Sequence, residues 1–551
     1  MTEEQIRTLQ AKLWAVADIL RGRMDADEYR DYMLGFIFYK YLSEIMQSYA
    51  DDKALKQDGL TYADITEGTP EGIEILGEVR HAAVGELGFF LLPSELFGAM
   101  AHRGTLRRPL GEGGARQGDP GFIIDDLKAV LRNIETSTLG TASQDDFDDL
   151  FSDMDLTNNR LGRTAETKND TIARILITLA EIDFRLDAAD GDILGDAYEY
   201  LIGEFAATAG KKAGEFYTPA QVSTILTRIV ATEWVTNSSG GDGKTPRAQP
   251  KPRIKDVYDP CCGSGSLLLR FRGEDIEIGS FYGQELNRTT YNLARMNMIL
   301  HGVRYDMFDL RQDDTLEHPA PAHAGLRFEA VVANPPFSAK WSAADTFSGD
   351  ERFGAFPRLP PASKADYCFV LHMLHHLADD GVMAVILPHG ALFRAGAEGA
   401  IRQHLIETKN WLDAVIGLPP NVFYGTSIPA CIMVFRKCRE ANDDVMVIDA
   451  SRHFTKVKNR NELRGEDVER IVDAWRTRAA VDRLARPVPL AEIAANGFNL
   501  NIPRYVDTSE PEVPVDLAAV TAELRRIDAE MAESAAEIRA YCAELGIEAP
   551  V

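Results

Sequence analysis

The stretch Ile254-Lys-Asp-Val-Tyr-Asp-Pro-Cys-Cys-Gly-Ser-Gly-Ser266 decides the expected fold of this 551-residue chain. Its first residues predict a buried strand, its glycines predict a turn, and the apolar Leu267-Leu-Leu269 that follows predicts the start of a helix. Gly263 and Gly265 allow backbone conformations and a close ligand approach that a Cβ would block. In a doubly wound sheet this first turn is where an adenosine-type cofactor lies, so the stretch predicts a cofactor site.

The turn differs from the two common glycine-rich phosphate loops. A dinucleotide-binding G-x-G-x-x-G pattern needs its third glycine where Leu268 stands, and a P-loop needs a Gly-Lys-Ser/Thr run that is missing from this turn. A tight strand-to-helix turn without a ligand is the alternative interpretation of this segment taken alone.

Two acidic positions follow the next predicted strands. The strand candidate Ile278-Gly-Ser-Phe-Tyr282 leads to Glu285, whose ionised carboxylate could accept from both hydroxyls of a ribose. Asp314 stands just before Leu316 at the third strand, where an acidic side chain could accept from an adenine amino group. Each acid alone is typical of a solvated loop, but their order behind a glycine turn favours adenosine recognition.

A second motif, Asn334-Pro-Pro-Phe337, follows the apolar run Phe328-Glu-Ala-Val-Val-Ala333 and predicts a strand that ends in a rigid hook. Its two prolines fix φ and leave their carbonyls as acceptors. The side-chain oxygen of Asn334 is another acceptor, so the hook could hold an exocyclic amino group while Phe337 stacks on a base. A proline-stiffened turn after a strand is the alternative.

Together these motifs resemble the modification subunit of type I restriction-modification systems, a family of S-adenosylmethionine-dependent DNA adenine-N6 methyltransferases. The resemblance covers nearly the whole chain, although Asp313 stands where the family more often has glycine. It rests on seven ordered segments: Gly214-Glu-Phe-Tyr-Thr-Pro219, Asp259-Pro-Cys-Cys-Gly-Ser-Gly265, Gly283-Gln-Glu285, Asp314-Thr-Leu316, Asn334-Pro-Pro-Phe337, Leu418-Pro-Pro-Asn-Val-Phe-Tyr-Gly-Thr426 and Phe498-Asn-Leu-Asn-Ile-Pro-Arg-Tyr505.

The resemblance implies S-adenosyl-L-methionine as the methyl donor, with no metal ion, and it assigns the site residue by residue. The catalytic residues it implies are Asn334, Pro335, Pro336 and Phe337. The cofactor-binding residues it implies are Glu215, Phe216, Tyr217, Thr218, Pro219, Ala220, Asp259, Gly263, Ser264, Gly265, Ser266, Glu285 and Asp314.

It also implies the reaction, which is site-specific methylation of adenine N6 in double-stranded DNA. The target adenine must leave the stack, because its N6 cannot reach the sulfonium inside a duplex. Asn334 and the Pro335 carbonyl would then hold N6 in line with the methyl group, and most of the rate would come from orientation.

Length and patterning predict three regions. Residues 1–188 carry apolar residues at helical spacing, as in Glu4 to Arg21 and Glu28 to Tyr49, and predict an α-helical domain with a loop from Arg103 to Gly121. Residues 189–480 predict an α/β, doubly wound, mostly parallel Rossmann-like class I methyltransferase sheet with a disordered insertion at about 236–253. Its strands are expected near Val257, Phe281, Val331, Val385, Val415 and Met433.

The third region, residues 481–551, is expected to be a C-terminal tail with a long helix over 515–545. Spacings of three and four between apolar residues predict a coiled-coil seam, although a helix folded back on its own domain shares this pattern. In the resembling family such a helix packs against a specificity subunit. The seam residues are Leu517, Val520, Leu524, Ile527, Met531, Ile538, Tyr541 and Leu545.

The formal net charge of −26 disfavours an autonomous DNA binder, which usually carries a basic field. The resemblance implies double-stranded DNA as the substrate, and the acidic charge favours a separate subunit that supplies sequence specificity. The resemblance adds a second copy of this chain and a restriction nuclease subunit. Without a bilayer-length apolar segment or a secretory signal, a cytoplasmic protein without membrane contact is expected. Basic residues after the hook could line a DNA channel, although scattered surface charges are the plainer interpretation: Lys340, Arg352, Arg358 and Lys364.

The cysteines and histidines favour no other chemistry. The six cysteines lack paired C-x-x-C spacing and predict reduced thiols, and Cys261-Cys262 has no nearby histidine pattern to activate a nucleophile. His372, His375 and His376 fall in a helix expected from Asp366 to Gly381, and the missing glutamate between them favours packing over a zinc site.

Two other functions stay open from the sequence. An amino methyltransferase acting on protein glutamine or on RNA could use the same hook, but the helical N-terminal region and the C-terminal helix argue against it. A non-catalytic assembly subunit is the other alternative, and the intact set of cofactor motifs weakens it.

Overall fold

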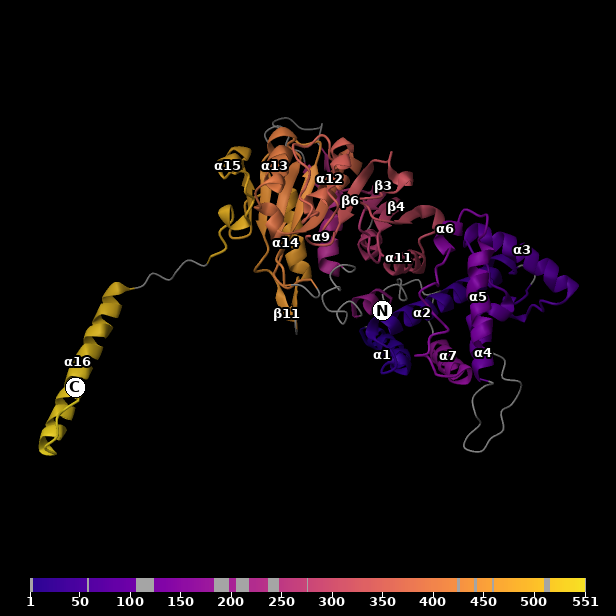
Figure 1. The fold of residues 1–551 in the computed structure, drawn as a ribbon, viewed down its shortest axis with the longest axis horizontal. Helices are drawn as coiled ribbons and strands as arrows, with labels where there is room; N and C mark the ends of the chain where they lie inside the picture. The colour runs from indigo at the N-terminus through magenta and orange to yellow at the C-terminus, as the bar shows by residue number, and fades with distance from the viewer. Residues whose placement is uncertain are drawn as a thin grey trace. The chain divides into compact units, whose positions relative to one another are not determined.

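The computed structural model describes residues 3–56, 59–105, 123–182, 198–204, 218–235, 247–274, 276–423, 427–440, 443–457, 460–509 and 516–550. The chain divides into two compact units, Met1–Val506 and Asp507–Val551 (Figure 1). The predicted domain boundary near residue 188 lies outside the described residues.

Helices packed around one apolar core form the N-terminal part of the first unit. Phe38 of α2 is fully buried and packs on Phe151, with 5.8 Å between the ring centroids. The helices expected over Glu4 to Arg21 and Glu28 to Tyr49 are confirmed, whereas most of the expected Arg103 to Gly121 loop lies outside the described residues. The helices of this part are α1 (Glu3–Leu20), α2 (Ala26–Tyr49), α3 (Pro70–Glu86), α4 (Phe97–Thr105), α5 (Ile123–Ser137), α6 (Gln144–Phe147) and α7 (Ala165–Ala180).

A mixed, mostly parallel sheet of nine strands forms the rest of this unit, in the order β13-β10-β8-β9-β7-β6-β3-β4-β5. All six predicted strand positions are confirmed. The strands are β3 (Arg253–Asp259), β4 (Glu277–Glu285), β5 (Phe308–Gln312), β6 (Phe328–Ala333), β7 (Leu377–Pro388), β8 (Leu412–Gly417), β9 (Ala430–Arg436), β10 (Val445–Asp449) and β13 (Ala485–Val488).

Strand order places a topological switch point between β3 and β6. The chain runs outward from β3 through β4 to β5, then returns to add β6 on the other side of β3, with parallel pairing throughout. In doubly wound sheets ligands bind at the carboxyl ends of the strands beside such a reversal. The glycine turn follows β3 and the Asn-Pro-Pro-Phe hook follows β6, so both motifs leave the sheet at this point.

Helices cover both faces of the sheet, as Figure 1 shows. The alternating residues of β6 divide between the two cores: Ala330 and Val332 pack with one set of helices, and Val331 and Ala333 pack with the other. The first set is α9 (Ala220–Val230), α10 (Ser266–Leu269), α11 (Arg288–Leu300) and α14 (Gly465–Thr477). The second includes α12 (Asp366–His376), α13 (Ala397–Gln403) and α15 (Leu490–Ala495).

Helix α11 joins the N-terminal helices to the sheet. Its Leu293 and Met296 belong to the N-terminal core, while Ala294 and Met298 belong to a core of the sheet. The buried Arg295 guanidinium donates to the carbonyl oxygens of Asp145 and Asp148 at 2.8 and 3.0 Å. Helix α11 therefore contributes side chains both to the core of the helical part and to one core of the sheet.

Three local expectations were wrong. Residues 236–246 of the expected disordered insertion lie outside the described residues, but β2 (Arg247–Pro250) pairs antiparallel with β1 (Thr232–Val235). The expected tail from residue 481 instead begins with β13, which pairs with β10 and closes one edge of the main sheet. Helix α12 ends at His376 rather than Gly381, because Leu377 already pairs with Phe328 of β6.

Two short strands, β11 (Thr455–Val457) and β12 (Arg460–Glu462), form a separate hairpin. Asn461 of β12 donates its side-chain amide to the Pro420 carbonyl at 2.7 Å and its backbone N–H to the Asn421 carbonyl at 3.1 Å. This hairpin therefore supports Pro420 and Asn421, which belong to one of the segments that carry the resemblance.

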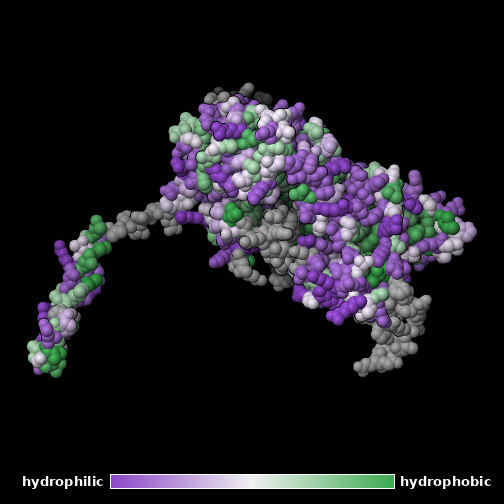
Figure 2. Space-filling model, in the orientation of Figure 1, coloured by the Kyte–Doolittle hydropathy of each residue, from purple (hydrophilic) through white to green (hydrophobic). Residues whose placement is uncertain are grey.

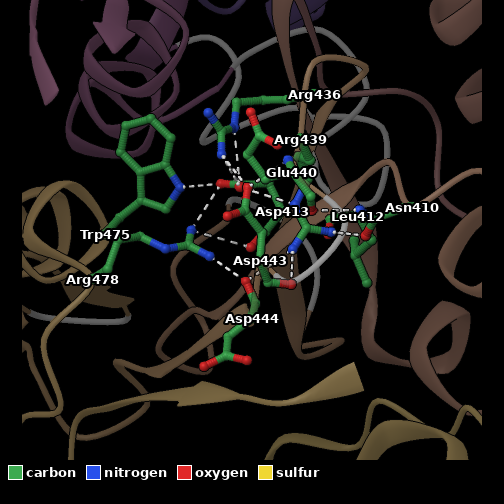
Figure 3. A network of polar contacts seen from close by, with 10 residues as sticks. All are labelled: Asn410, Leu412, Asp413, Arg436, Arg439, Glu440, Asp443, Asp444, Trp475 and Arg478. Atoms are coloured by element: carbon green, nitrogen blue, oxygen red, sulfur yellow. Dashed lines mark hydrogen bonds and ion pairs between the residues drawn. The ribbon is translucent and has the colours of Figure 1, made fainter. Parts of the chain in front are cut away.

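A buried charge network lies around Asp413, at the start of β8 (Figure 3). The fully buried carboxylate accepts from Arg436 at 2.8 Å, from Arg478 at 3.1 Å and from the Trp475 indole at 2.7 Å. The neighbouring arginines lower the Asp413 pKa to about 2 despite burial, which opposes them. The network therefore ties β8, β9 and α14 together.

The second unit consists mainly of α16 (Leu517–Glu544), which confirms the expected long helix. Its N-cap Asp516 accepts from the N–H groups of Ala518 and Ala519, both at 3.0 Å. All eight seam residues are exposed in the described part of the chain, and hydrophobic patches along this helix are visible in Figure 2. None of the described helices has both the length and the apolar character to cross a bilayer.

Candidate active site

The glycine turn after β3 has the backbone that its sequence predicts. Gly263 and Gly265 have φ values of 55° and 78°, in the left-handed region that favours glycine. A Cβ on Gly283 of the neighbouring β4 would lie 2.8 Å from Leu310 and 3.0 Å from Cys262. The absence of that Cβ lets the turn lie directly against β4.

Asp259 supports this turn from beneath. Its side chain is only 1% exposed, and its Oδ1 accepts from the Cys261 N–H at 2.8 Å. Burial and the nearby Glu285 raise the Asp259 pKa to about 8. The buried Ser264 and Ser266 hydroxyls lie 3.0 Å apart, and Asn297 donates to the Ser264 carbonyl at 2.9 Å. These three predicted cofactor residues therefore shape the turn.

Glu285 links the turn to the start of α11. One carboxylate oxygen accepts from the Gly263 N–H at 3.1 Å, and the other accepts from the Asn287 N–H at 2.8 Å. Burial raises the Glu285 pKa while these N–H groups lower it. Each carboxylate oxygen has more than one acceptor position, so the pair keeps the capacity to accept from two ribose hydroxyls.

Asp314 organises the turn after β5. Its Oδ1 accepts from the N–H groups of Leu316 and Glu317 at 2.8 and 3.2 Å. Behind this turn, Arg352 donates to the carbonyls of Thr315 and Leu316, both at 2.9 Å. Arg352 is only 5% exposed, so it braces the Asp314 turn and is not the channel residue that the sequence allowed.

The hook after β6 lies beside the start of α9. The Asn334 side-chain NH₂ donates to the Thr218 hydroxyl at 3.1 Å, which directs the amide nitrogen toward Thr218 and leaves the oxygen as the acceptor. Pro335 is buried, and Phe337 makes an edge contact with Phe423, with 5.9 Å between the ring centroids. Two motifs separated by 116 positions in the sequence thus meet at the hook.

Thr218 belongs to the predicted cofactor segment 215–220. Pro219 is the N-cap residue of α9 and Ala220 is its first residue, so the three described residues of the segment start this helix. The other three predicted residues, Glu215, Phe216 and Tyr217, lie outside the described residues.

A cavity of about 760 Å³ is lined by two of the predicted cofactor residues, Glu285 and Asp314, and by one hook residue, Pro336. Cys261 of the glycine turn lines it as well. Its volume lies in the range of roughly 300–1,000 Å³ that is usual for small-molecule sites. With carboxylates at Glu285 and Asp314 and apolar surface at Pro336, these residues fit a ligand that has both ribose hydroxyls and a planar base.

Sequence reasoning missed part of this cavity. Arg30 and Asp31 of α2 line it, although they lie more than 200 positions before the glycine turn, and no local pattern marks them. Trp341 and Phe369 also line it. Phe369 carried a usable signal, because it stands in the first turn of the apolar helix that follows the hook.

Two of the three α12 histidines, His372 and His376, belong to the packed interior, whereas His375 is only partly buried. Arg352 has only N–H donors and lies 3.2 Å from His372 Nδ1, so this nitrogen accepts and the Nε2–H donates to the Tyr258 hydroxyl at 2.8 Å. Burial lowers the His372 pKa well below its usual value. His376 accompanies it in an aromatic cluster with Tyr258 and Phe328.

The fold and the site define the class of the protein. A doubly wound sheet, a glycine turn at its switch point, an acid after the second strand and an Asn-Pro-Pro-Phe hook after β6 are the features of a class I amino-methyltransferase.

Comparisons with known proteins specify this class further. The family model described as N-6 DNA methylase matches residues 189–513, and the model described as HsdM N-terminal domain matches residues 9–178. The methylase subunit of the type I restriction enzyme MpnII from Mycoplasma pneumoniae is 34% identical over 93% of this chain and 92% of its own length. The chain belongs to the N-6 DNA methylase family, among the methylase subunits of type I restriction enzymes.

Solved structures agree with this placement. The methyltransferase subunit of the type I restriction-modification system from Streptococcus thermophilus has a TM-score of 0.76 and 39% identity, and the match covers 92% of this chain and all of that one. A modification subunit of a type I restriction enzyme from Vibrio vulnificus shares the fold, with a TM-score of 0.57 and 19% identity over 92% and 97% of the two chains.

Proposed function

We propose that this chain transfers a methyl group from S-adenosyl-L-methionine to N6 of an adenine flipped out of double-stranded DNA, and that a separate specificity subunit selects the site. The observation that carries the proposal is the meeting of the hook with the cofactor motifs. Pro336 shares a cavity with Glu285, and Asn334 bonds to Thr218.

The cofactor would be held along the ends of β3, β4 and β5. Glu285 would accept from the ribose hydroxyls, Asp314 would lie near the adenine, and Cys261 would line the floor of the site. When bound, S-adenosyl-L-methionine supplies an electrophilic methyl group on a sulfonium. Asp259, Ser264 and Ser266 act indirectly, because they hold the glycine turn in shape.

The hook would orient the acceptor amino group. Asn334 Oδ1 and the Pro335 carbonyl oxygen would accept hydrogen bonds from the two N6–H groups. This arrangement disfavours the flat, conjugated form of the amine and directs the nitrogen lone pair at the methyl group. Phe337, held against Phe423, would stack on the flipped base. The N6 proton released on transfer leaves to water.

The assembly is part of the proposal. A net charge of −26 opposes DNA binding by this chain alone, so a partner must supply much of the phosphate contact and the sequence readout. The exposed seam of α16 suits a helical partner, and we assign it to the specificity subunit. A second copy of this chain and a nuclease subunit would complete the complex, which would act in the cytoplasm.

Asn334→Ala tests the catalytic assignment. The variant loses both the amide acceptor and the bond to Thr218, so N6 methylation by the complex should fall by at least about 100-fold, the scale of a lost orienting contact. Binding of S-adenosyl-L-methionine, measured by calorimetry, and assembly with the specificity subunit should persist.

Asn133→Ala, on α5 away from the cavity, is the matched control and should methylate normally. Unchanged methylation by Asn334→Ala would favour the assembly-subunit alternative. Methylation of protein glutamine or RNA by the wild type, without DNA methylation, would favour the alternative of an amino methyltransferase with another substrate.

A further inference from the structure

The residue that follows the hook has an unusual backbone. Ser338 has a φ of 54°, in the left-handed region that residues with a Cβ rarely adopt. This conformation sets the direction in which the chain leaves Phe337. A strained position of this kind persists only where its surroundings hold it.

Asp366, the first residue of α12, provides that hold. Its carboxylate is only 1% exposed, and its Oδ1 accepts from the Ser338 N–H at 2.8 Å. The adjacent Ala365 N–H donates to the Ala339 carbonyl at 2.8 Å. Two hydrogen bonds therefore fasten the end of the hook to the start of α12.

The ion pairs of Arg394 hold Asp366 itself in place. Arg394 donates to its Oδ2 at 2.6 Å and to the buried Glu398 at 2.9 Å. A Cβ on Gly390 would lie 2.4 Å from the Arg394 guanidinium, so glycine at this position leaves room for it. The Asp366 carboxylate thus has a partner on each oxygen and little freedom to rotate.

The same groups also hold the Ser338 side chain. Lys364 and Arg394 donate to the Ser338 hydroxyl at 3.2 and 3.4 Å. Ser338 is therefore held through both its N–H and its hydroxyl, by side chains that surround Asp366 and line no part of the cofactor cavity.

We propose that Asp366 is a positioning residue for methyl transfer: it holds Ser338 in the left-handed conformation and so fixes the Asn334–Phe337 hook relative to the cofactor cavity. The inference rests on the proposed function of the hook. Asp366 acts through the backbone of Ser338 and does not itself touch the substrate.

The test compares Asp366→Ala, Asp366→Asn, Ser338→Gly and the double variant Asp366→Ala/Ser338→Gly in the complex with the specificity subunit. Asp366→Ala should lower kcat by about 10- to 100-fold, the effect of misplacing a reacting group by a fraction of an ångström to one ångström. Asp366→Asn keeps an acceptor for the Ser338 N–H, so it should lower kcat less than Asp366→Ala does. The Kd for S-adenosyl-L-methionine should stay within about twofold in every variant, because its site is untouched.

Rescue separates positioning from a merely structural role. Glycine adopts the left-handed conformation without a Cβ penalty, so Ser338→Gly should restore part of the kcat that Asp366→Ala loses. Asp413→Ala is the matched control, since it also removes a buried aspartate paired with arginine. That variant should lower the melting temperature and leave the kcat of the folded complex unchanged.

The inference would be overturned by a wild-type kcat in folded Asp366→Ala, or by a double variant no more active than Asp366→Ala. If Asp366→Ala does not fold, Asp366→Asn carries the same comparison, and a kcat that is lowered in Asp366→Asn and not restored by Ser338→Gly also overturns the inference. A wild-type complex that binds the cofactor but methylates no DNA would contradict the proposed function instead.

Discussion

Glu285 shows how much of the site depends on single side chains. Its carboxylate bonds to the glycine turn on one side and to the start of α11 on the other, while it also lines the cavity. Asn334 has a similar double position, since it directly follows β6 and bonds to Thr218, which precedes the N-cap residue of α9. Each of these side chains links two parts of the fold and keeps oxygen acceptor capacity for a further hydrogen bond.

We therefore predict that Glu285→Gln weakens cofactor binding. The amide keeps the size of the side chain, but its NH₂ must face either a backbone N–H or the ribose hydroxyls. The loss of one charged acceptor should cost about 1.5–3 kcal/mol, or roughly 10- to 100-fold in Kd, by calorimetry with S-adenosyl-L-methionine.

Glu277→Gln at the exposed start of the same strand is the control for that change, and its Kd should match the wild type. Equal affinities for Glu285→Gln and Glu277→Gln would remove Glu285 from the cofactor site.

At the scale of elements, the sequence correctly predicted the features that depend on residues close together in the chain. The strands β3, β4 and β6, the glycine turn and α16 were predicted because apolar spacing, glycine placement and capping act within a few residues. The strands β2 and β13 were missed, because a short strand at a sheet edge is stabilised by its partner and not by its own pattern. The contacts of Asp366 with Ser338 and of Asn334 with Thr218 likewise depend on tertiary packing.

The Asp413 network should make the stability of the sheet depend on acid pH. Its folded pKa of about 2 lies below the ordinary 3.8, so the ionised form stabilises the fold fully above about pH 4, and this contribution is lost as the pH falls toward 2. Asp413→Asn leaves Arg436, Arg439 and Arg478 around a neutral side chain and should cost about 3–5 kcal/mol at pH 7. The difference in melting temperature from the wild type should shrink between pH 4 and pH 2.

Asp126→Asn is the control for this change, since its ion pair with Arg103 is exposed and should contribute at most about 1 kcal/mol. A pH-independent difference between Asp413→Asn and the wild type would contradict the assigned ionisation.

The apolar seam of α16 predicts where the partner binds. Leu524→Asp places a charge in the seam and should weaken assembly with the specificity subunit by at least about 100-fold, because a carboxylate would be buried in the helical interface. Pull-down and analytical ultracentrifugation measure this, while cofactor binding by the chain alone should not change. Ala529→Asp adds the same side chain to the opposite side of the helix and should assemble normally. Equal assembly by both variants would show that the seam does not bind the specificity subunit.

At the scale of the whole molecule, the N-terminal helices and the sheet build one site together. Arg30 donates to Asp31 at 2.8 Å, and both line the cavity that Pro336 and Phe369 also line. The N-terminal contacts of α11 hold the helix that starts beside Glu285. The sequence predicted the chemistry of the site, whereas the contribution of Arg30 and Asp31 to the cavity depends on packing between residues far apart in the chain.

This contribution to the cavity predicts that Arg30→Ala lowers cofactor affinity by about tenfold, or about 1.4 kcal/mol, because it opens one side of the cavity. Calorimetry with S-adenosyl-L-methionine provides the measurement. Arg103→Ala, on the same helical part but away from the cavity, should bind as the wild type does. Wild-type cofactor affinity in Arg30→Ala would mean that Arg30 lines the cavity without contributing to cofactor binding.

The most direct test of the central claim maps N6-methyladenine in genomic DNA from cells that express this chain with its specificity subunit, each partner alone, or the pair with Asn334→Ala. Our account predicts methylation of one discrete motif only when both wild-type partners are present. No adenine methylation by an assembled, cofactor-binding complex, or undiminished methylation with Asn334→Ala, would contradict it.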